Sequence, residues 1–272
     1  MIKKSEKYIG NIILFILIVY FALPHLWLVL TAFNPAPKPF LTIFTPALNN
    51  FIRVFKEARG LIYFKNSILM GLFTMIIATL TSAAAGFGFA KLKIKGKNTI
   101  LLILLITTSI PLIGYIVPYY KLCTALRMTN SYWGCILLFS SSSLPFNIWL
   151  IKQFIDTLPK ELIEAAQIDG CNMFDVFIKI ILPVSLPVLI IVSLNSFNAA
   201  WGNFLAPQVL LTKSKLFPLS VGMVQESITP YGFYDLGLFS AFSIIYALPV
   251  AILYIFLRKY LLKGMLGGAV KG

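Results

Sequence analysis

The sequence predicts an all-α integral membrane protein with six transmembrane helices, and three observations lead there. Of the 272 residues, 59% are hydrophobic and only 12% are charged, about half the charged fraction of an average soluble domain. The mean hydropathy is +0.88. So few charges cannot cover a water-soluble globule of this size, and the apolar excess must face lipid. Finally, six apolar stretches reach the roughly 20 residues that a helix needs to cross a bilayer.

The six spans are expected at 9–32, 67–90, 99–119, 132–151, 184–206 and 236–257, within a single transmembrane domain covering 1–272. Helices are expected because, inside lipid, each backbone polar group must be satisfied within its own segment. The first span follows Lys3, Lys4 and Lys7 as a signal peptide does. Its apolar run is too long for a signal peptide, and no small-residue cleavage site follows, so we expect it to be retained.

The basic residues predict the orientation of the spans. Lys91, Lys93, Lys95 and Lys97 fall in the short loop between spans two and three, and such clusters stay in the cytoplasm. Both termini are then cytoplasmic, as are the loop at 156–183 and the tail at 258–272. The net charge of +14 follows the same topology rule, so lipid is an expected partner and nucleic acid is not.

Several kinds of chemistry are absent from the sequence. Cys123, Cys135 and Cys171 have no metal-like spacing and His25 is the single histidine, so we predict no metal site and no catalytic residue. No charged side chain lies well inside a span, which argues against proton coupling, although sodium coupling through backbone carbonyls stays open. The chain also has no GxxxxGK[ST] phosphate loop. Energy is therefore expected from a partner that holds the nucleotide.

Prolines fall inside three of the expected spans. Pro111, Pro145 and Pro187 lie in spans three, four and five, and proline interrupts the helical hydrogen-bond ladder. Two interpretations stay open: ordinary bending within a bundle, or hinges that open and close a pathway.

The loop at 156–183 predicts two short helices with a glycine turn between them. Pro159 suits a first helical turn, and Glu161 and Glu164 favour a helix start near the positive end of the dipole. Gly170 is a typical C-cap, and Asn172 can cap the second helix. Pro183 either ends that helix or passes it into span five. The apolar residues expected on one face of the second helix are Phe174, Phe177, Ile178 and Ile181.

This loop resembles the EAA loop of ATP-binding-cassette importer permeases. Glu164-Ala165-Ala166, then Asp169-Gly170, then Ile-Leu-Pro at 181–183 repeat the order and spacing of that signature. The resemblance implies the type I permease fold and a first helix that docks in a groove of an ATPase subunit. It further implies a coupling role for this set: Glu161, Glu164, Ala165, Ala166, Asp169 and Gly170.

Within that role, Glu164 is expected to pair with a basic residue of the ATPase, while Ala165 and Ala166 permit close approach and Gly170 allows the turn. The alternative is a solvated amphipathic loop lying on the membrane.

Two further segments are similar to one branch of the family, the branch of the second membrane subunit of the maltose importer. One is Asn66-Ser67 at the start of span two, and the other is the glycine-rich end at 264–272. In that branch the tail reaches into the ATPase dimer interface, which implies coupling roles for Gly267, Gly268, Lys271 and Gly272. A disordered end is the alternative.

Polar side chains in spans four and five are candidates for the cargo pathway. They are Ser142, Asn147, Asn195, Asn198, Trp201 and Asn203. Amides and hydroxyls suit sugar hydroxyls, and Trp201 could stack on a sugar ring. The alternative is hydrogen bonding between helices. The family usually has an acidic residue near Asn203, and this chain has none between Trp201 and Phe204.

The resemblance as a whole implies a non-enzymatic permease subunit in a bacterial or archaeal cell membrane, in an importer most suited to a sugar or oligosaccharide. Its partners would be a second homologous permease, two ATPase subunits holding ATP and magnesium, and an extracytoplasmic solute-binding protein met by the outer segment 208–235. No cofactor is expected in this chain. Two alternatives stay open: import of a polyol or glycerol phosphate by the same machinery, and an ion-coupled carrier that works alone.

Overall fold

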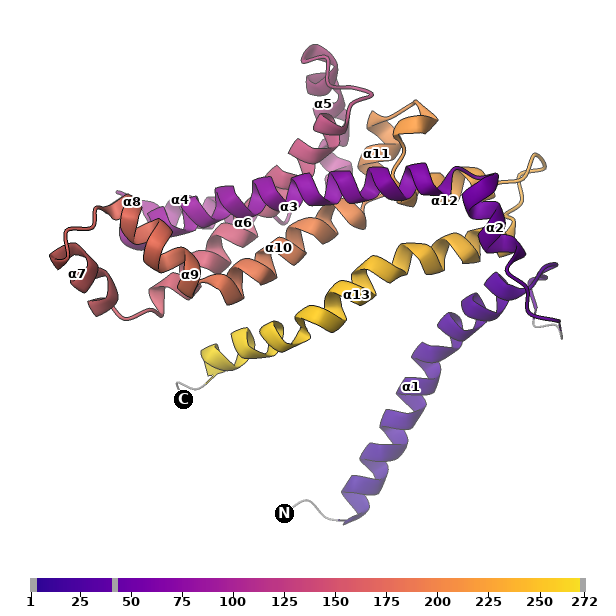
Figure 1. Ribbon diagram of the computed structural model, residues 1–272, viewed down its shortest axis with the longest axis horizontal. Coiled ribbons are helices and arrows are strands. Elements are labelled where there is room, and N and C mark those ends of the chain that lie inside the picture. Colours follow the sequence, from indigo (N-terminus) through magenta and orange to yellow (C-terminus); the bar gives the residue numbers. More distant parts are fainter. Residues whose placement is uncertain (1–3, 41–43, 270–272) are drawn as a thin grey trace. The chain divides into compact units, whose positions relative to one another are not determined.

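The computed structural model describes residues 4–40 and 44–269, with the backbone alone for 4–7, 9 and 258–269. In the described residues the regular elements are helices, joined by one isolated β-bridge between Ile228 and Tyr234 (Figure 1). The helices are α1 (Lys4–Phe33), α2 (Asn49–Lys56), α3 (Gly60–Lys91), α4 (Lys97–Thr107), α5 (Leu112–Ala125), α6 (Tyr132–Asp156), α7 (Glu161–Ile168), α8 (Met173–Val176), the π-helix η1 (Phe177–Ile181), α9 (Leu182–Val184), α10 (Leu186–Trp201), α11 (Leu205–Leu210), the 3₁₀-helix η2 (Ser214–Leu216), α12 (Leu219–Ser227) and α13 (Leu236–Ala269).

Four of these helices are long and apolar enough to cross a membrane by themselves. Their candidate spans are Gly10–Phe33, Gly60–Lys91, Tyr132–Asp156 and Leu236–Leu257. Two further candidates are bent pairs. Lys97–Thr107 meets Leu112–Ala125 at 96°, and Met173–Val184 meets Leu186–Trp201 at 81°. The count is six, as the sequence predicts, when each bent pair contributes one span; α10 then carries most of the fifth, since 173–183 belongs to the loop expected in the cytoplasm.

The three prolines expected to bend the spans behave differently. Pro111 lies directly before α5, with an extended backbone (ψ 142°) that no helix can contain. It therefore stands at a full break in the third span, and the segment expected at 99–119 is two helices. Pro187 lies within the first turn of α10, just after the 81° bend. Pro145 is inside α6, which continues unbroken from Tyr132 to Asp156.

The chain divides into two compact units that are described separately. Unit 1 contains Met1–Ile62 and Gly222–Pro249. Its buried side chains include Val54, Ala241 and Phe242, and hydrogen bonds from the buried Asn50 hold the segment after α1. Unit 1 therefore has an apolar core of its own, and this core includes a hydrogen-bonded amide.

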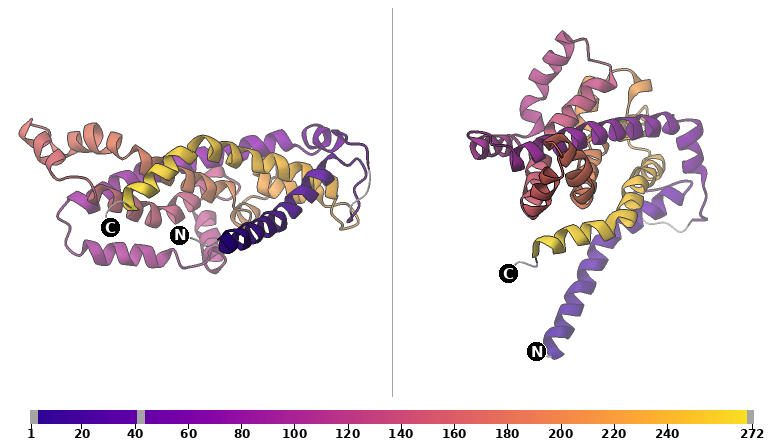
Figure 2. Two further views of the ribbon diagram at one scale, coloured as in Figure 1. Left: turned by 90° about the horizontal axis from the view of Figure 1, so that it is seen from below. Right: turned by 60° about the vertical axis from the view of Figure 1, so that its left-hand side comes forward.

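Unit 2 contains Tyr63–Val221 and Val250–Gly272. Within it α6 and α10 pack along each other and α4 packs on α6, while α7 lies beyond the ends of these helices (Figure 1; Figure 2, left). Two groups of buried apolar residues fill this unit. The "loop cluster" lies near α7, η1 and the start of α10, and it consists of Ala83, Phe87, Ile151, Ile155, Ile163, Ala166, Val176, Ile181, Val188 and Val192. The "α11 cluster" lies near α5, α11 and the start of α6, and it consists of Met70, Ile116, Cys123, Cys135, Ile136, Leu138, Phe139, Ala200, Ala206, Leu210 and Leu211.

Candidate functional site

The loop between α6 and α10 forms the two short helices that the sequence predicts. Glu161 and Glu164 occupy the first turn of α7, where carboxylates favour the positive end of the helix dipole. Neither carboxylate is buried, since both side chains belong to exposed residues. The start of α7 therefore presents two negative charges to its surroundings.

A glycine turn separates the two helices. Gly170 has φ of +84° and open space where a Cβ would stand, so its backbone conformation, and not crowding, calls for glycine. The Cys171 N–H donates to the Ala166 carbonyl at 2.9 Å across this turn. Asn172 then caps α8, its Oδ1 accepting from the N–H groups of Phe174 (2.9 Å) and Asp175 (3.0 Å).

The second loop helix does not end at Pro183, which was one of the two outcomes expected from the sequence. Pro183 lies inside α9 without ending it, and the break comes at Ser185, before the 81° bend into α10. Backbone bonds persist through the bend, because the Ser185 N–H donates to the Ile181 carbonyl at 2.8 Å and the Leu189 N–H donates to the Ser185 carbonyl at 2.9 Å. The π-helix η1 precedes the bend, and such segments occur often at functional sites.

One side of this loop is anchored in the loop cluster. Its four most buried apolar residues are Ile163, Ala166, Val176 and Ile181. They join buried residues of three spans: Ala83 and Phe87 of α3, Ile151 and Ile155 of α6, and Val188 and Val192 of α10. The loop is therefore attached to the bundle by apolar packing from both of its helices.

The opposite side of the loop is exposed and combines apolar with acidic side chains. Ile168 is 85% exposed and Phe174 is 72% exposed, and Glu161, Glu164 and Asp169 are exposed beside them. Exposed apolar side chains beside acidic ones suit a surface that another protein or a membrane covers.

Two details of the expected loop surface are corrected by burial. Ala166 is 5% exposed and packs inside this chain, so its small side chain serves the approach of α7 to its own bundle; Ala165 remains exposed. The expected single apolar face of the second helix is divided as well. Ile181 is buried and Phe174 faces outward, because the wider π-helical turn between them changes the angular spacing.

A cleft of about 490 Å³ lies beside α7, against the ends of α3 and α6. Charged side chains of both signs line it, namely Lys91, Asp156, Lys160 and Glu164. Asp156 is already paired with Lys152 at 2.7 Å. Glu164 thus belongs both to the exposed surface of α7 and to the cleft beside it.

The other predicted coupling residues lie at the C-terminal end. Gly267 and Gly268 fall in α13, whose helical backbone continues to Ala269. Lys271 and Gly272 lie outside the described residues. A helix through Ala269 differs from the disordered end that was the alternative for this segment, as far as the described residues reach.

The amides of spans four and five form a seam between α6 and α10. Asn147 is fully buried, and its Nδ2 donates to Ser196 Oγ at 2.8 Å. Asn195 Nδ2 donates to Asn147 Oδ1, also at 2.8 Å. For Asn147 and Asn195 the structure therefore supports hydrogen bonding between helices over cargo contact.

The four other pathway candidates are also placed by the structure. Trp201 is 2% exposed and its ring is stacked on Phe197 with centroids 5.4 Å apart, so it is closed to a sugar ring. Asn203 Oδ1 accepts from the Ala206 N–H at 3.0 Å and starts α11. Asn198 is exposed. Ser142 is exposed too, and it lines a cavity against α4 and α5.

Asn66, known from the sequence only as part of the branch resemblance, proves to be a structural staple. Its Nδ2 donates to the carbonyls of Lys215 (3.0 Å) and Phe217 (2.9 Å), and its Oδ1 accepts from the Tyr132 hydroxyl at 2.8 Å. Ser67 Oγ accepts from the Leu219 N–H at 2.7 Å. These bonds fix the segment that follows α11 to the start of α3.

Asn130 holds the other side of the same segment, and sequence reasoning missed it. Its Oδ1 accepts from the N–H of Thr212 (2.7 Å) and of Lys213 (3.2 Å), and its own N–H donates to the Leu210 carbonyl at 2.9 Å. Its φ is +56°, a conformation that asparagine tolerates better than most residues. A lone asparagine between two spans was the available signal.

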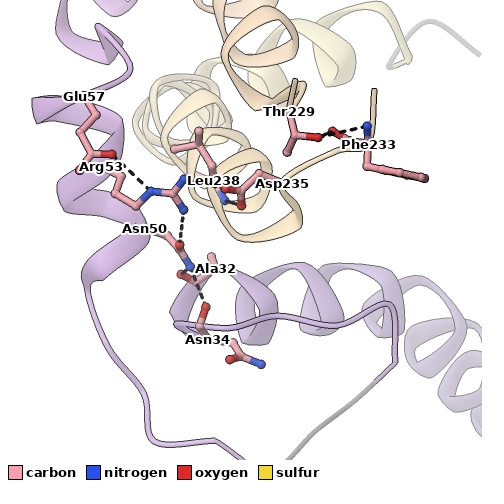
Figure 3. Close-up of polar contacts among 9 residues, drawn as sticks. All are labelled: Ala32, Asn34, Asn50, Arg53, Glu57, Thr229, Phe233, Asp235 and Leu238. Atoms are coloured by element: carbon pink, nitrogen blue, oxygen red, sulfur yellow. Dashed lines mark hydrogen bonds and ion pairs between the residues drawn. The ribbon is translucent and has the colours of Figure 1, made fainter. Parts of the chain in front are cut away.

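In unit 1, a polar cluster holds the chain entering α13 (Figure 3). Arg53 Nη2 lies 2.6 Å from Asp235 Oδ2, and the other oxygen of Asp235 accepts from the Leu238 N–H at 3.0 Å. Burial disfavours the charged Asp235, but the bonds from Leu238 and Arg53 outweigh it and hold its pKa below the ordinary value. A Cβ on Gly237 would come within 2.6 Å of Asn50, so glycine permits this contact.

A small exposed hairpin precedes Asp235. The Thr229 N–H donates to the Phe233 carbonyl at 2.8 Å, and Thr229 Oγ1 accepts from the Phe233 N–H at 3.2 Å (Figure 3). Tyr231 is 87% exposed and Phe233 is 74% exposed. The hairpin therefore presents aromatic rings outward from a backbone fixed by hydrogen bonds.

Comparison with known proteins gives the family of this chain. Residues 79–266 match the family described as "Binding-protein-dependent transport system inner membrane component". The chain is 36% identical over 221 residues to the arabinooligosaccharides transport system permease protein AraQ of Bacillus subtilis (strain 168), covering 78% of this chain and 75% of that protein. It is 29% identical over 279 residues to the galactooligosaccharides transport system permease protein GanQ of the same organism, covering 99% and 98%.

A solved structure shares the fold. It is the crystal structure of a bacterial ABC transporter involved in the import of the acidic polysaccharide alginate, which matches with a TM-score of 0.81 over 96% of this chain and 99% of that chain at 18% identity. Together with a family match across 79–266, more than half of the sequence, this shows that the chain belongs to the binding-protein-dependent transport system inner membrane components and is the non-catalytic, multi-pass membrane permease of an ATP-binding-cassette importer.

Proposed function

We propose that this permease imports a neutral carbohydrate, most suitably an oligosaccharide, as one of two different membrane subunits in its complex. Relatives named for arabinooligosaccharides, galactooligosaccharides and maltodextrins match it along about three quarters or more of their length. Three different carbohydrate cargoes among these relatives support the class of cargo and leave the individual sugar open.

The coupling role rests on one observation: the loop at 156–183 is anchored on one side and exposed on the other. Ile168 and Phe174 supply apolar contact area, and Glu161, Glu164 and Asp169 supply negative charge for basic residues of an ATPase subunit. Because Ile163 and Ile181 are buried in the loop cluster, a displacement of the docked helix is passed to the spans. ATP and magnesium belong to the two ATPase subunits.

This assignment sets the orientation. The loop at 156–183, the lysines at 91–97 and both termini lie in the cytoplasm, in keeping with the distribution of basic residues. The chain end beyond Leu266 continues toward the ATPase dimer, with Gly267, Gly268, Lys271 and Gly272 as its contact residues.

On the outer side, the hairpin with Tyr231 and Phe233 meets the solute-binding protein. Exposed aromatic rings are favourable anchors for protein interfaces, and the Arg53–Asp235 pair fixes the base of the hairpin at 2.6 Å. This assigns a partner to the outer segment that the sequence predicts at 208–235.

The two alternatives left open by the sequence have different outcomes. Because the chain belongs to the importer family, the hypothesis of an ion-coupled carrier that works alone is given up. A polyol remains compatible with the same import machinery. A glycerol phosphate would favour basic side chains in the pathway, and no Lys or Arg lies well inside the spans.

The deciding experiment is reconstitution of the complete complex in proteoliposomes. We expect ATP-dependent uptake of at least one radiolabelled sugar from a panel of arabinooligosaccharides, galactooligosaccharides and maltodextrins, and no uptake when the ATPase subunits are left out. Uptake of glycerol 3-phosphate alone would contradict the carbohydrate assignment.

A charge reversal tests the coupling role in the same vesicles. We expect Glu164→Lys to abolish uptake while the chain stays inserted and pairs with its permease partner, because the exposed carboxylate is replaced by a like charge facing a basic groove. Lys179→Glu, also on the loop but in a separate ion pair with Asp175 (2.7 Å), is the control and should be milder. Wild-type uptake by Glu164→Lys would refute the docking role.

A further inference from the structure

The third span is interrupted where a membrane helix should be continuous. α4 ends at Thr107, α5 begins at Leu112, and the two axes meet at 96°. α4 packs on α6, and α6 carries four consecutive serines at 140–143. The break thus brings irregular backbone and a serine-rich stretch of the neighbouring span to the same place.

A cavity of about 320 Å³ lies at this break, at the lower end of the roughly 300–1,000 Å³ range of ligand sites. Hydroxyl groups from three helices and their connection line it, together with the apolar side chains of one isoleucine and one proline. The residues are Thr107, Thr108, Ile110, Tyr115, Ser141, Ser142 and Pro145.

Four of these hydroxyls have already used their proton. Thr107 and Thr108 donate to the carbonyls of Leu104 and Leu105, each at 2.6 Å. Ser141 and Ser142 likewise donate to carbonyls one turn earlier in α6, at 2.9 Å and 3.1 Å. A hydroxyl has one proton and two lone pairs, so each oxygen still offers acceptor capacity to the cavity.

This surface is unsuited to lipid. Residues 107 to 110, Ser141 and Ser142 are exposed in this chain, and the backbone between Thr107 and Leu112 is not helical. In a membrane, irregular backbone occurs only where protein covers it or where it lines an aqueous cavity. Transporters also tend to build their cargo sites at discontinuous helices near the middle of the membrane.

We propose that the cavity between α4, α5 and α6 is a cargo site of this chain, and that it binds one unit of a neutral, polyhydroxylated solute. Sugar hydroxyls donate to the oxygens of Thr107, Thr108, Ser141 and Ser142. The Tyr115 side chain supplies an aromatic wall for the C–H face of the ring, with its own hydroxyl at the edge.

The chemistry of the lining selects the class of cargo. Oxygens whose protons are already engaged attract donor groups and repel anions, and none of the residues lining the cavity is Lys or Arg. Phosphorylated and carboxylated solutes are therefore excluded from the site, while sugars and polyols fit it. This inference rests on the proposed carbohydrate function and adds the residues that contact the cargo.

The first test is transport by the reconstituted complex, using the panel sugar that the wild-type complex imports. We expect the double variant Thr108→Val with Ser142→Ala to lower uptake about tenfold, since each lost hydrogen bond is worth a factor of roughly three to five. Stimulation of the ATPase by the loaded binding protein should change little. Thr124→Val is the matched control, because Thr124 is also exposed and bonded to its own helix at 2.9 Å but does not line the cavity.

The second test measures access to the cavity and does not depend on turnover. In a Cys171→Ser background, a cysteine is introduced by Ser142→Cys; Cys123 and Cys135 are buried. We expect a membrane-impermeant methanethiosulfonate to label it in the complex, and the imported sugar to slow labelling severalfold. Thr124→Cys should show no protection.

These outcomes separate the two proposals. A wild-type complex that imports no carbohydrate refutes the proposed function itself. A wild-type complex that imports sugar, combined with normal uptake by the double variant or with labelling of Ser142→Cys only by a lipid-soluble maleimide, refutes the cavity alone.

Discussion

The two ends of α10 both pack against apolar clusters, and they differ in the contacts that are added to this packing. At the Leu186 end, the loop at 156–183 is attached through apolar side chains of the loop cluster, among them Ile163 and Ile181. At the Trp201 end, the segment after α11 is attached through side-chain amides, with Asn66 and Asn130 bonded to its backbone. One helix therefore connects an apolar joint with a polar one.

The two kinds of contact differ in how much movement they allow the attached segment. Hydrogen bonds are directional and weaken steeply with misalignment, so the amides fix the segment after α11 in a single register. Apolar packing is non-directional, so the loop can tilt on its cluster at lower cost. The loop end also contains the π-helix η1 and the bend at Ser185, whereas the other end has α11 started by Asn203. We expect the loop end to move and the Trp201 end to stay fixed during transport.

The largest expected effect comes from the turn that joins the two loop helices. Gly170→Pro should abolish uptake, because proline fixes φ near −65° where the native φ is +84°, and because it removes the N–H that donates to the Gln167 carbonyl at 3.1 Å. Uptake by reconstituted complexes measures this.

Gly170→Asn is the matched control. Asparagine tolerates a left-handed backbone, and a Cβ at this position meets open space, so most uptake should remain. Equal loss in both variants would show that the glycine is required for contact with the partner and not for the turn.

The polar joint is expected to contribute mainly to stability. Asn66→Leu leaves the Lys215 and Phe217 carbonyls and the Tyr132 hydroxyl without their partner, at about 1–3 kcal/mol for each group that stays buried. Thermal unfolding of the purified chain in detergent measures the loss. Tyr132→Phe removes only one of the three bonds and should cost roughly 1 kcal/mol; equal shifts for the two variants would contradict the staple.

The sequence predicted the structure of the loop joint but not the contacts of the polar joint. The loop could be predicted because caps and turns are local: Gly170 and Asn172 act within a few residues of themselves. The spans could be predicted for the same reason, because the length of an apolar stretch is a local property of the sequence. Asn66 and Asn130 act on segments 149 and 82 residues away, and no local pattern encodes such a pairing.

The remaining differences also come from packing over distance. Asn147 and Trp201 lie in apolar spans, where the sequence leaves cargo contact and bonding between helices open. Both side chains are buried, with Asn147 bonded to Ser196 of the neighbouring helix and Trp201 stacked on Phe197 of its own helix. The break at Pro111 was visible as a bend only, since its 96° angle depends on how α4 and α5 pack against their neighbours. Ala165 and Ala166 are alike in sequence and differ in which side faces the bundle.

That last difference gives a test of the apolar joint. Ala166→Leu adds volume to a site that is 5% exposed and should destabilise the chain by about 1–3 kcal/mol through overpacking. Ala165→Leu, at an exposed position, should leave thermal unfolding unchanged and lower ATPase stimulation in the assembled complex. The reverse result would place Ala166 on the docking surface after all.

The smallest effect is expected where a polar contact is only partly buried. The Arg53–Asp235 pair in unit 1 is short, at 2.6 Å, but its side chains are 37% and 23% exposed, and such a pair is worth about 1 kcal/mol or less. Because the pKa of Asp235 lies below its ordinary value of 3.8, its contribution is present above that pH and is lost as the pH falls through the lowered pKa. The midpoint temperature of thermal unfolding should therefore fall slightly more steeply from pH 7 to pH 3 for wild type than for Asp235→Asn. A large loss at neutral pH in Asp235→Asn would mean that this exposed pair holds the chain as firmly as the buried amide of Asn66, and burial would then not be what makes the polar joint strong.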